Sequence, residues 1–420
     1  MSAADSPLRT ATAPLRSRAF RRYAAGQLPS ITCSWAQVVA LSAVVVALDP
    51  AALAWVMVLQ FAPTLVLGAW CGALADRFDR RTLLMAAEAG LGLVATGYAV
   101  AAATDRLTLP VIGALAALWG IVNAVDTPAR RALTPQLVPA AAAPAAAAVS
   151  GTLMLVGMTV GAALGGLLVP AFGAAVAFGI NALSFFVDVA VLATLRVGHS
   201  PRTPRAPRQV RDGLAHVWHT PALRLPLVVL AAVTTTTFTY QVSVPLLVQE
   251  RLGGGAAGIG AALAVFTAGS LAGTVVAATR GRPSTRTTAV ATAVIAAGQL
   301  VVGLAPALAL AGLAVAGLGW SVLLTTVVAQ LQQARPDVLG RVMAVFAVVL
   351  LGATVVSGPV AGWLAVVAGA TAPFLVGAGA AALTAGLLTA RRTPAGATGR
   401  VLVDQGQKVA DGDQQTTICP

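Results

Sequence analysis

Two carboxylates, Glu88 and Asp188, are the only acidic side chains well inside the long apolar stretches of this sequence. A charged carboxylate in hydrocarbon costs at least about 2.5 kcal/mol, so each requires a function or a partner. Asp188 has no basic residue closer in its own stretch than Arg196, about 12 Å along a helix, which favours it as a proton-binding group. Glu88 lies about two helical turns from Arg81 and has the alternative role of pairing with arginines.

Residues for several other chemistries are missing from the sequence. Its single lysine, Lys408, excludes a GxxxxGK[ST] nucleotide-binding loop and a Schiff-base lysine within an apolar stretch. The three cysteines and three histidines lack a convincing metal-ligand spacing, so we expect neither a metal nor a cofactor. No nucleophile, base and acid form a plausible set, which predicts that the protein is not an enzyme.

The composition indicates a protein of the lipid bilayer. Of its 420 residues 58% are hydrophobic, and the mean hydropathy is +0.85. Apolar runs of about 18 or more residues recur, each long enough to cross a hydrocarbon layer about 30 Å thick as a helix. The runs are continuous rather than alternating, which favours helices over barrel strands. The sequence therefore predicts an all-α membrane protein.

Gly, Pro and charged residues divide these runs into twelve predicted transmembrane helices. Their approximate ranges are 28–48, 51–74, 82–103, 109–125, 146–169, 173–195, 225–249, 254–279, 287–305, 308–329, 342–367 and 371–390. With this count, all but two of the 27 basic residues fall on one side of the membrane, the exceptions being Arg106 and Arg251. The positive-inside rule then predicts that both termini of this cell-membrane protein face the cytosol. Arginines spread over every inner loop also argue against nucleic-acid binding, and the first 27 residues show no cleavable signal peptide.

The longest polar interruption divides the helices into six plus six. We expect a cytosolic segment, an amino-terminal bundle, a basic cytosolic linker, a carboxy-terminal bundle and a disordered cytosolic tail, at 1–27, 28–195, 196–224, 225–390 and 391–420. Within the linker, Gln209 to Trp218 favours an interfacial amphipathic helix with Val210, Leu214 and Trp218 on one face. A shift of 197 positions aligns Gly161 with Gly358 and Gly165 with Gly362, as expected for two pseudo-symmetric bundles.

The loop after the second helix reads GALADRFDRR and gathers five charges in ten residues, from Gly72 to Arg81. It is similar to the pattern G-x-x-x-D-R-x-G-R-R of the major facilitator superfamily, with Asp79 where the pattern has glycine. Together with VDTPARRALTPQLVP, from Val125 to Pro139, it resembles the branch of drug and proton antiporters that includes macrolide and enterobactin exporters. The resemblance covers nearly the whole chain and implies the major facilitator fold.

The resemblance also implies a conformational latch on the cytosolic side. In such proteins the loop aspartate, here Asp76, faces the start of the eleventh helix near Arg341, and a loop arginine pairs with an acid at the end of helix four, here Asp126. A carboxylate at a helix amino terminus gains about 0.3 to 1 kcal/mol. The predicted latch residues are Gly72, Asp76, Arg77, Arg80, Arg81, Asp126 and Arg341.

A glycine pattern in the fifth span resembles the antiporter signature of the same superfamily. GMTVGAALGG keeps four of its glycines, with Ala162 in place of a proline, and the kept positions are Gly157, Gly161, Gly165 and Gly166. Close packing of helices through small residues is an equally good explanation.

In this fold the first, fourth, seventh and tenth helices line the central cavity. Their neutral polar and aromatic residues are the substrate-binding candidates Trp35, Gln37, Trp119, Asn123, Thr235, Phe238, Tyr240, Gln241, Trp320, Ser321 and Thr325. Such a cavity suits an amphipathic organic molecule, and hydrogen bonding within the bundle is an equally good explanation of the threonines.

We therefore predict a monomeric, proton-coupled efflux transporter, as in multidrug resistance, working by alternating access. The alternatives are a facilitator or importer of a small metabolite, and a transport-inactive membrane sensor or assembly protein.

Overall fold

The computed structural model describes residues 13–195, 209–237, 240–279, 283–334 and 336–390, and all regular structure in these ranges is helical. The amino-terminal helices are α2 (Arg18–Leu48), α3 (Ala52–Arg77), α4 (Arg80–Ala103), α5 (Leu109–Leu133) and α6 (Ala143–Ala193). The carboxy-terminal ones are α7 (Gln209–His219), α8 (Pro221–Thr237), α9 (Tyr240–Leu247), α10 (Gly255–Thr279), α11 (Thr285–Leu304), α12 (Ala309–Leu331), α13 (Pro336–Ala368) and α14 (Ala372–Ala390). Short turns η1 to η5 cover Ala13–Arg16, Thr134–Leu137, Ala140–Ala142, Val248–Leu252 and Pro306–Leu308.

The helices make twelve crossings, as predicted. Ten segments of the described chain are apolar and long enough to span a membrane, and α3 adds an eleventh crossing of 26 residues. The last comes from α6, which consists of two helices that meet at Gly173. Gly173 has φ 81° and ψ 165°, a conformation that glycine adopts readily because it has no Cβ.

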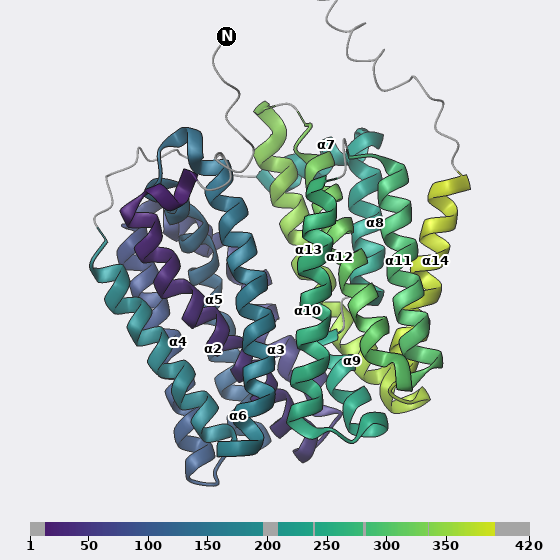
Figure 1. The fold of residues 1–420 in the computed structure, drawn as a ribbon. Coiled ribbons are helices and arrows are strands. Elements are labelled where there is room, and N and C mark those ends of the chain that lie inside the picture. The colour runs from purple at the N-terminus through teal and green to yellow at the C-terminus, as the bar shows by residue number, and fades with distance from the viewer. Residues whose placement is uncertain (1–12, 196–208, 238–239, 280–282, 335, 391–420) are drawn as a thin grey trace, which may run out of the picture.

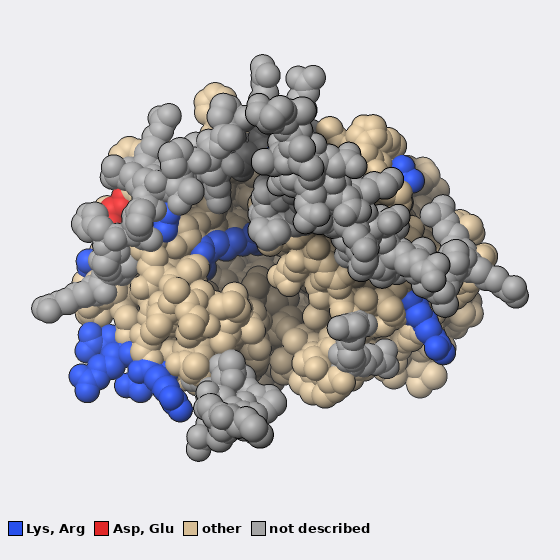
Figure 2. All heavy atoms as spheres, turned by 90° about the horizontal axis from the view of Figure 1, so that it is seen from above, with Lys and Arg blue, Asp and Glu red and all other residues tan. Residues whose placement is uncertain are grey.

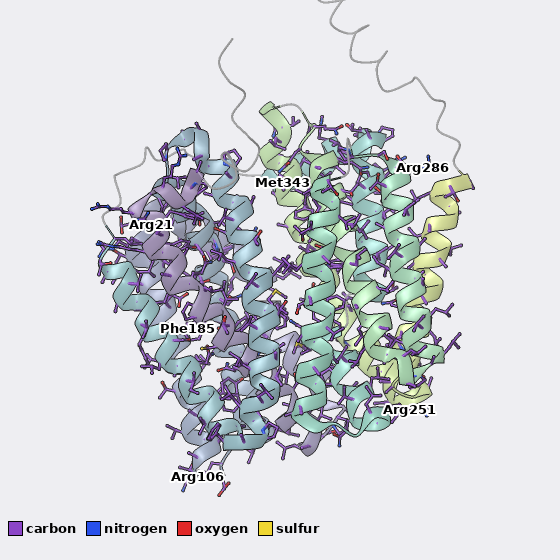
Figure 3. The ribbon with its side chains drawn as sticks, viewed as in Figure 1. Arg21, Arg106, Phe185, Arg251, Arg286 and Met343 are labelled. Carbon is purple, nitrogen blue, oxygen red and sulfur yellow. The ribbon has the colours of Figure 1, made fainter. Side chains whose placement is uncertain are left out.

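Figure 1 shows the two bundles side by side, α2 to α6 in colours from purple to teal and α8 to α14 in colours from teal to yellow. The helix α2 begins and α14 ends at the same membrane face, which we call the terminal face. In Figure 3 the labelled Arg21 and Arg286 lie toward this face, whereas Arg106 and Arg251 lie at the opposite one. This arrangement agrees with the predicted distribution of arginines.

Two close backbone contacts between the bundles lie toward the opposite face. A Cβ added to Gly166 of α6 would be 3.1 Å from the Cα of Gly260 in α10, and one added to Gly362 of α13 would be 2.7 Å from the Cβ of Ala54 in α3. Figure 2 shows the terminal face, where a hollow lies near the centre with a basic side chain at its edge. The bundles are thus closed against each other at the opposite face and apart at the terminal face.

Several helices are longer than predicted, and one extension matters for the site. The helix α5 continues to Leu133 instead of ending near residue 125, with Pro128 inside it. Asp126 and Arg130 are therefore helical residues and do not belong to a loop. Hydropathy shows where apolar sequence stops, but a helix continues when its polar side chains find partners in the bundle.

The linker helix corresponds to α7, whose contacts are with α8 and α13. Its Val217 is buried, whereas Leu214 and Trp218 are exposed. The guanidinium of Arg224 lies 5.7 Å from the centre of the Trp218 ring, close enough for a cation–π contact.

Candidate functional site

Arg130, one turn before the end of α5, lies among three carboxylates from three helices. Its Nη2 donates to Oε1 of Glu88 and, at 3.2 Å, to Oδ1 of Asp126. Its Nε donates to Oδ2 of Asp126 at 3.3 Å, and its Nη1 lies 3.7 Å from Oδ2 of Asp188. We call Glu88, Asp126, Arg130 and Asp188 the carboxylate cluster.

Helix geometry explains how these side chains meet. Asp126 and Arg130 are four residues apart on α5 and so share one face of that helix. Glu88 comes from α4 and Asp188 from the second half of α6, and α4 packs against both α5 and α6. On the α2 side, a Cβ at Gly26 would overlap Oδ1 of Asp188, so only glycine permits this approach of backbone to carboxylate.

The cluster is buried and its charges do not balance. Asp188 is 0% exposed and Glu88 is 1% exposed, whereas the Arg130 side chain is 18% exposed. If all four groups were ionised, three negative charges would face one positive charge in a poorly hydrated region, which is costly. A proton bound by one carboxylate removes part of that cost, so the arrangement is suited to taking up and releasing a proton.

A cluster of apolar side chains lies one helical turn nearer the terminal face than the charged groups. Its members include Phe20 and Tyr23 of α2, Leu84 of α4, Leu133 of α5 and Leu192 of α6, all fully buried. Leu133 and Leu192 come about one turn after Arg130 and Asp188 on helices that run toward that face, and Leu84 comes about one turn before Glu88 on a helix that begins there. These residues shield the carboxylates on that side.

The predicted latch residues are placed as follows. Asp126 pairs with Arg130, whereas Arg81 donates from Nε to the Leu192 carbonyl at 2.7 Å and from Nη2 to the Ala193 carbonyl. Arg80 donates to the Ala132 carbonyl at 3.4 Å. Both loop arginines therefore bind the last carbonyls of α5 and α6, where positive charge is favourable.

The rest of the latch is only partly described. Gly72, Asp76 and Arg77 belong to the last turns of α3, but the side chains of Asp76 and Arg77 lie outside the described part of the structure. Arg341 is half-buried in α13. The contact between Asp76 and the start of the eleventh span stays a prediction. Asp79 accepts hydrogen bonds from Thr82 N at 2.8 Å and caps α4, which accounts for an aspartate at this position.

The four signature glycines of α6 pack against two different helices. Added Cβ atoms at Gly157, Gly161 and Gly165 would overlap α2, the last at 2.9 Å from the Cα of Ala36. Gly166 instead faces Gly260 of α10 in the other bundle. The pattern therefore serves close packing within one bundle and across the interface between bundles.

Two of the substrate-binding candidates line a small cavity inside the carboxy-terminal bundle. Tyr240 and Trp320 are there joined by Phe266, Gln299 and Phe374. The rings of Tyr240 and Phe266 are stacked, with centroids 4.3 Å apart and planes 23° apart.

Another candidate lies between the bundles. Gln241 lines a cleft with Met57 and Phe61 of α3 and with Thr354 and Ser357 of α13. The Phe61 ring contacts the Trp119 ring edge-on at 6.4 Å, so Trp119 lies directly behind this cleft. The described lining is neutral and mixes apolar with polar groups.

The remaining candidates are dispersed. Trp35 packs on Gly161, and Ser321 forms a 2.7 Å hydrogen bond with Thr274 within the carboxy-terminal bundle. Gln37 is bonded to Asn181 at 2.8 Å. Asn123 and Thr235 are half-buried, Thr325 is exposed, and Phe238 lies outside the described residues.

Arg130 was not among the residues predicted for the site. The signal that could have found it is its spacing of four residues from Asp126, which makes sense only if the helix continues past residue 125.

Together, the twelve crossings and the two bundles define a membrane transporter of the major facilitator fold. Solved structures share this fold. A mutant of the nucleoside transporter NupG has a TM-score of 0.69 at 11% identity and covers 90% of this chain and 100% of its own. A bacterial homologue of the human lysosomal transporter Spinster, inward-facing and unoccupied, has a TM-score of 0.65 at 14% identity. The match covers 92% of this chain and 96% of that protein. The Escherichia coli fucose:proton symporter FucP has a TM-score of 0.58 at 15% identity. The match covers 89% of this chain and 98% of that protein.

The chain belongs to the transmembrane secretion effector family of the major facilitator superfamily, whose model matches residues 9–400. The MFS-type transporter YfiS of Bacillus subtilis is 29% identical over 175 residues, which are 40% of this chain and 41% of YfiS. The staphyloferrin A transporter of Staphylococcus aureus is 28% identical over 131 residues, 31% of this chain and 33% of that protein. In these matches the chain spans about two fifths and one third of the relatives' lengths.

Proposed function

We propose that this protein exports an amphipathic organic molecule across the cell membrane in exchange for protons, as a monomer with both termini in the cytosol. The observation that carries the proposal is the carboxylate cluster, in which Arg130 is shared by Glu88, Asp126 and Asp188. A buried group of this kind is expensive in a membrane and is explained by proton coupling. The description of the family as secretion effectors favours export.

In the proposed cycle, the opening and closing of the two bundles is coupled to the release and uptake of a proton. With the bundles closed at the opposite face by contacts such as Gly166 with Gly260, substrate enters from the cytosol through the terminal face. Arg130 compensates the carboxylates in this state, after a proton has been released. Reopening toward the outside lets a carboxylate take up a proton again. One proton moving down about 100 mV contributes about 2.3 kcal/mol to export.

The neutral cleft around Gln241 and Phe61 supports the substrate class. Its lining offers apolar surface and a few hydrogen-bonding groups without charge, which suits a molecule with both kinds of surface. The proposal includes membership of the drug and proton antiporter branch, on the loop residues that resemble it.

The test is transport in inverted membrane vesicles with an imposed pH gradient and a panel of amphipathic compounds. We expect Glu88→Gln, Asp126→Asn and Asp188→Asn each to reduce pH-driven accumulation. Asp105→Asn is the control, because Asp105 is exposed at the opposite face and has φ 54°, which asparagine also adopts. Undiminished accumulation in all three variants would refute proton coupling through this cluster.

A facilitator or importer of a small metabolite is the second candidate, because the neutral cleft suits it equally well. It predicts equilibration of substrate without accumulation when the pH gradient is imposed, or accumulation in the opposite direction. A sensor or assembly protein predicts no ligand-dependent flux in reconstituted vesicles.

A further inference from the structure

A line of buried polar side chains runs along the contact between α2 and the second half of α6. Asn181 donates from Nδ2 to Oε1 of Gln37 at 2.8 Å and accepts at Oδ1 from Ser34 Oγ at 3.2 Å. Ser184 Oγ donates to the Asn181 carbonyl at 2.8 Å and lies 3.3 Å from its Oδ1. We call Ser34, Gln37, Asn181 and Ser184, together with Asp188, the polar seam.

The seam is continuous with the carboxylate cluster. Asn181, Ser184 and Asp188 have the spacing i, i+3, i+7 and therefore lie on one face of α6. On α2, Gln27, Ser30, Ser34 and Gln37 follow the same kind of spacing, and the first, second and last are buried. From Asp188 to Asn181 the seam covers about 10 Å along the helix, and it ends near the middle of the first span. Phe185, labelled in Figure 3, marks this level inside the amino-terminal bundle.

Packing alone does not account for the seam. Another face of α2 packs with apolar and small residues, where Ala36 and Val39 meet Gly165 in the first half of α6. Polar groups lose solvation when buried, so the four buried members of the seam, Gln37, Asn181, Ser184 and Asp188, are a costly way to join two helices. Neither Oδ1 nor Oδ2 of Asp188 has a hydrogen-bond partner within the described structure, so this end of the seam keeps acceptor capacity.

The polar seam extends from Asp188 toward the middle of the membrane. On the terminal side of Asp188 lie the buried apolar residues Phe20, Leu133 and Leu192. On the other side, toward the middle of the membrane, the neighbours of Asp188 along α6 are Ser184 and Asn181. Polar contact therefore leads from the carboxylate away from the terminal face.

We propose that the polar seam is the route by which protons pass between the carboxylate cluster and the middle of the membrane. The inference rests on the proposed function and adds the path. Water is the carrier: a hydronium ion transfers its proton to a carboxylate oxygen of Asp188, leaving water, and the reverse step returns it. Hydroxyls and amides of the seam both donate to and accept from water. The charged groups facing Asp188 are Glu88 from α4 and Asp126 and Arg130 from α5.

Thiol accessibility tests whether the seam admits water. In a full-length chain with Cys33, Cys71 and Cys419 changed to alanine, Ser184→Cys places one thiol in the seam, and Ala182→Cys places one at a buried, apolar position of the same helix. Silver ion, a small hydrated cation, is the probe. We expect the thiol at 184 to react at least about tenfold faster, a difference of about 1.4 kcal/mol in barrier. Equal rates would overturn the proposal.

Proton movement is tested by a pH jump on the opposite side of oriented vesicles, followed by infrared absorption of protonated carboxyl groups. Asn181→Leu is expected to slow protonation about tenfold, whereas Asn181→Ser, which replaces the amide with a hydroxyl that can also donate and accept hydrogen bonds, stays close to the native rate. Equal rates in Asn181→Leu and the native protein would refute the route. Loss of pH-driven transport is not used as the readout, so failure of the proposed export and failure of the seam are distinguishable.

Discussion

Nη1 of Arg130 in α5 lies 3.7 Å from Oδ2 of Asp188 in α6, although the two residues belong to segments far apart in the sequence. Glu88 and Asp126 bind the same guanidinium. The two acids that the sequence offers as separate proton-binding candidates are thus parts of one cluster. Their titration is expected to be coupled, so a change at one carboxylate alters proton binding at the others.

Removal of the central charge gives the first prediction. Arg130→Gln leaves three buried carboxylates without a compensating charge, and breaking a buried ion pair costs about 3 to 5 kcal/mol. We expect a lower melting temperature at pH 8 and partial recovery at pH 5.5, because protonated carboxylates no longer need the guanidinium. Thermal unfolding in detergent at both pH values checks this.

Arg106→Gln is the matched control, since Arg106 is exposed at the opposite face. The double variant Arg130→Gln, Asp188→Asn should regain part of the lost stability at pH 8. A melting temperature of Arg130→Gln that does not change between the two pH values would contradict the charge argument.

A methyl group at Gly26 gives the second prediction. Its Cβ would overlap Oδ1 of Asp188 and lie 3.1 Å from the Cβ of Val191. Gly26→Ala should therefore displace the carboxylate from Arg130 and cost about 1 to 3 kcal/mol of stability through overpacking. We expect reduced pH-driven transport at normal expression. Gly151→Ala, with no atom within 4 Å of the added Cβ, should behave like the native protein.

The interface between the bundles gives the third prediction. A Cβ at Gly260 would be 2.5 Å from the Cα of Gly166 and 2.6 Å from the Ala162 carbonyl oxygen. Gly260→Ala should destabilise closure at the opposite face, and a penalty of about 1 to 3 kcal/mol shifts a two-state equilibrium about 5- to 150-fold. Spin-label distances across that face should lengthen. Unchanged distances relative to Gly179→Ala, which meets no atom within 4 Å, would exclude this role.

The loop after α3 gives the fourth prediction, which separates two aspartates. Asp76→Asn is expected to shift the protein toward the inward-facing state and lower flux while membrane insertion is preserved. Asp79→Asn should act differently, because Asp79 caps α4 through Thr82 N; asparagine is also a good cap, so little change is expected. Spin-label distances across the terminal face and flux at equal expression check both variants. Normal flux in Asp76→Asn would remove the latch.

The fold was predictable because its determinants act on one segment at a time. Hydropathy decides whether a segment crosses the membrane, and the side on which its flanking arginines remain decides the orientation. Both can be counted along the sequence, so the twelve crossings followed without tertiary information. Helix ends could not be predicted in the same way, because α5 continues to Leu133 through a polar stretch in which Arg130 has partners on α4 and α6.

The grouping of residues was decided by tertiary structure alone. Along the chain the nearest cation to Asp188 in its own span is Arg196, whereas in space Arg130 is 3.7 Å away. Tyr240 and Gln241 are adjacent in sequence, yet one lines a cavity within a bundle and the other the cleft between bundles. Sequence thus determined which residues are costly to bury in a membrane. The packing of helices from distant parts of the chain determined which of them share one charge, because such contacts leave no periodic signal in the sequence.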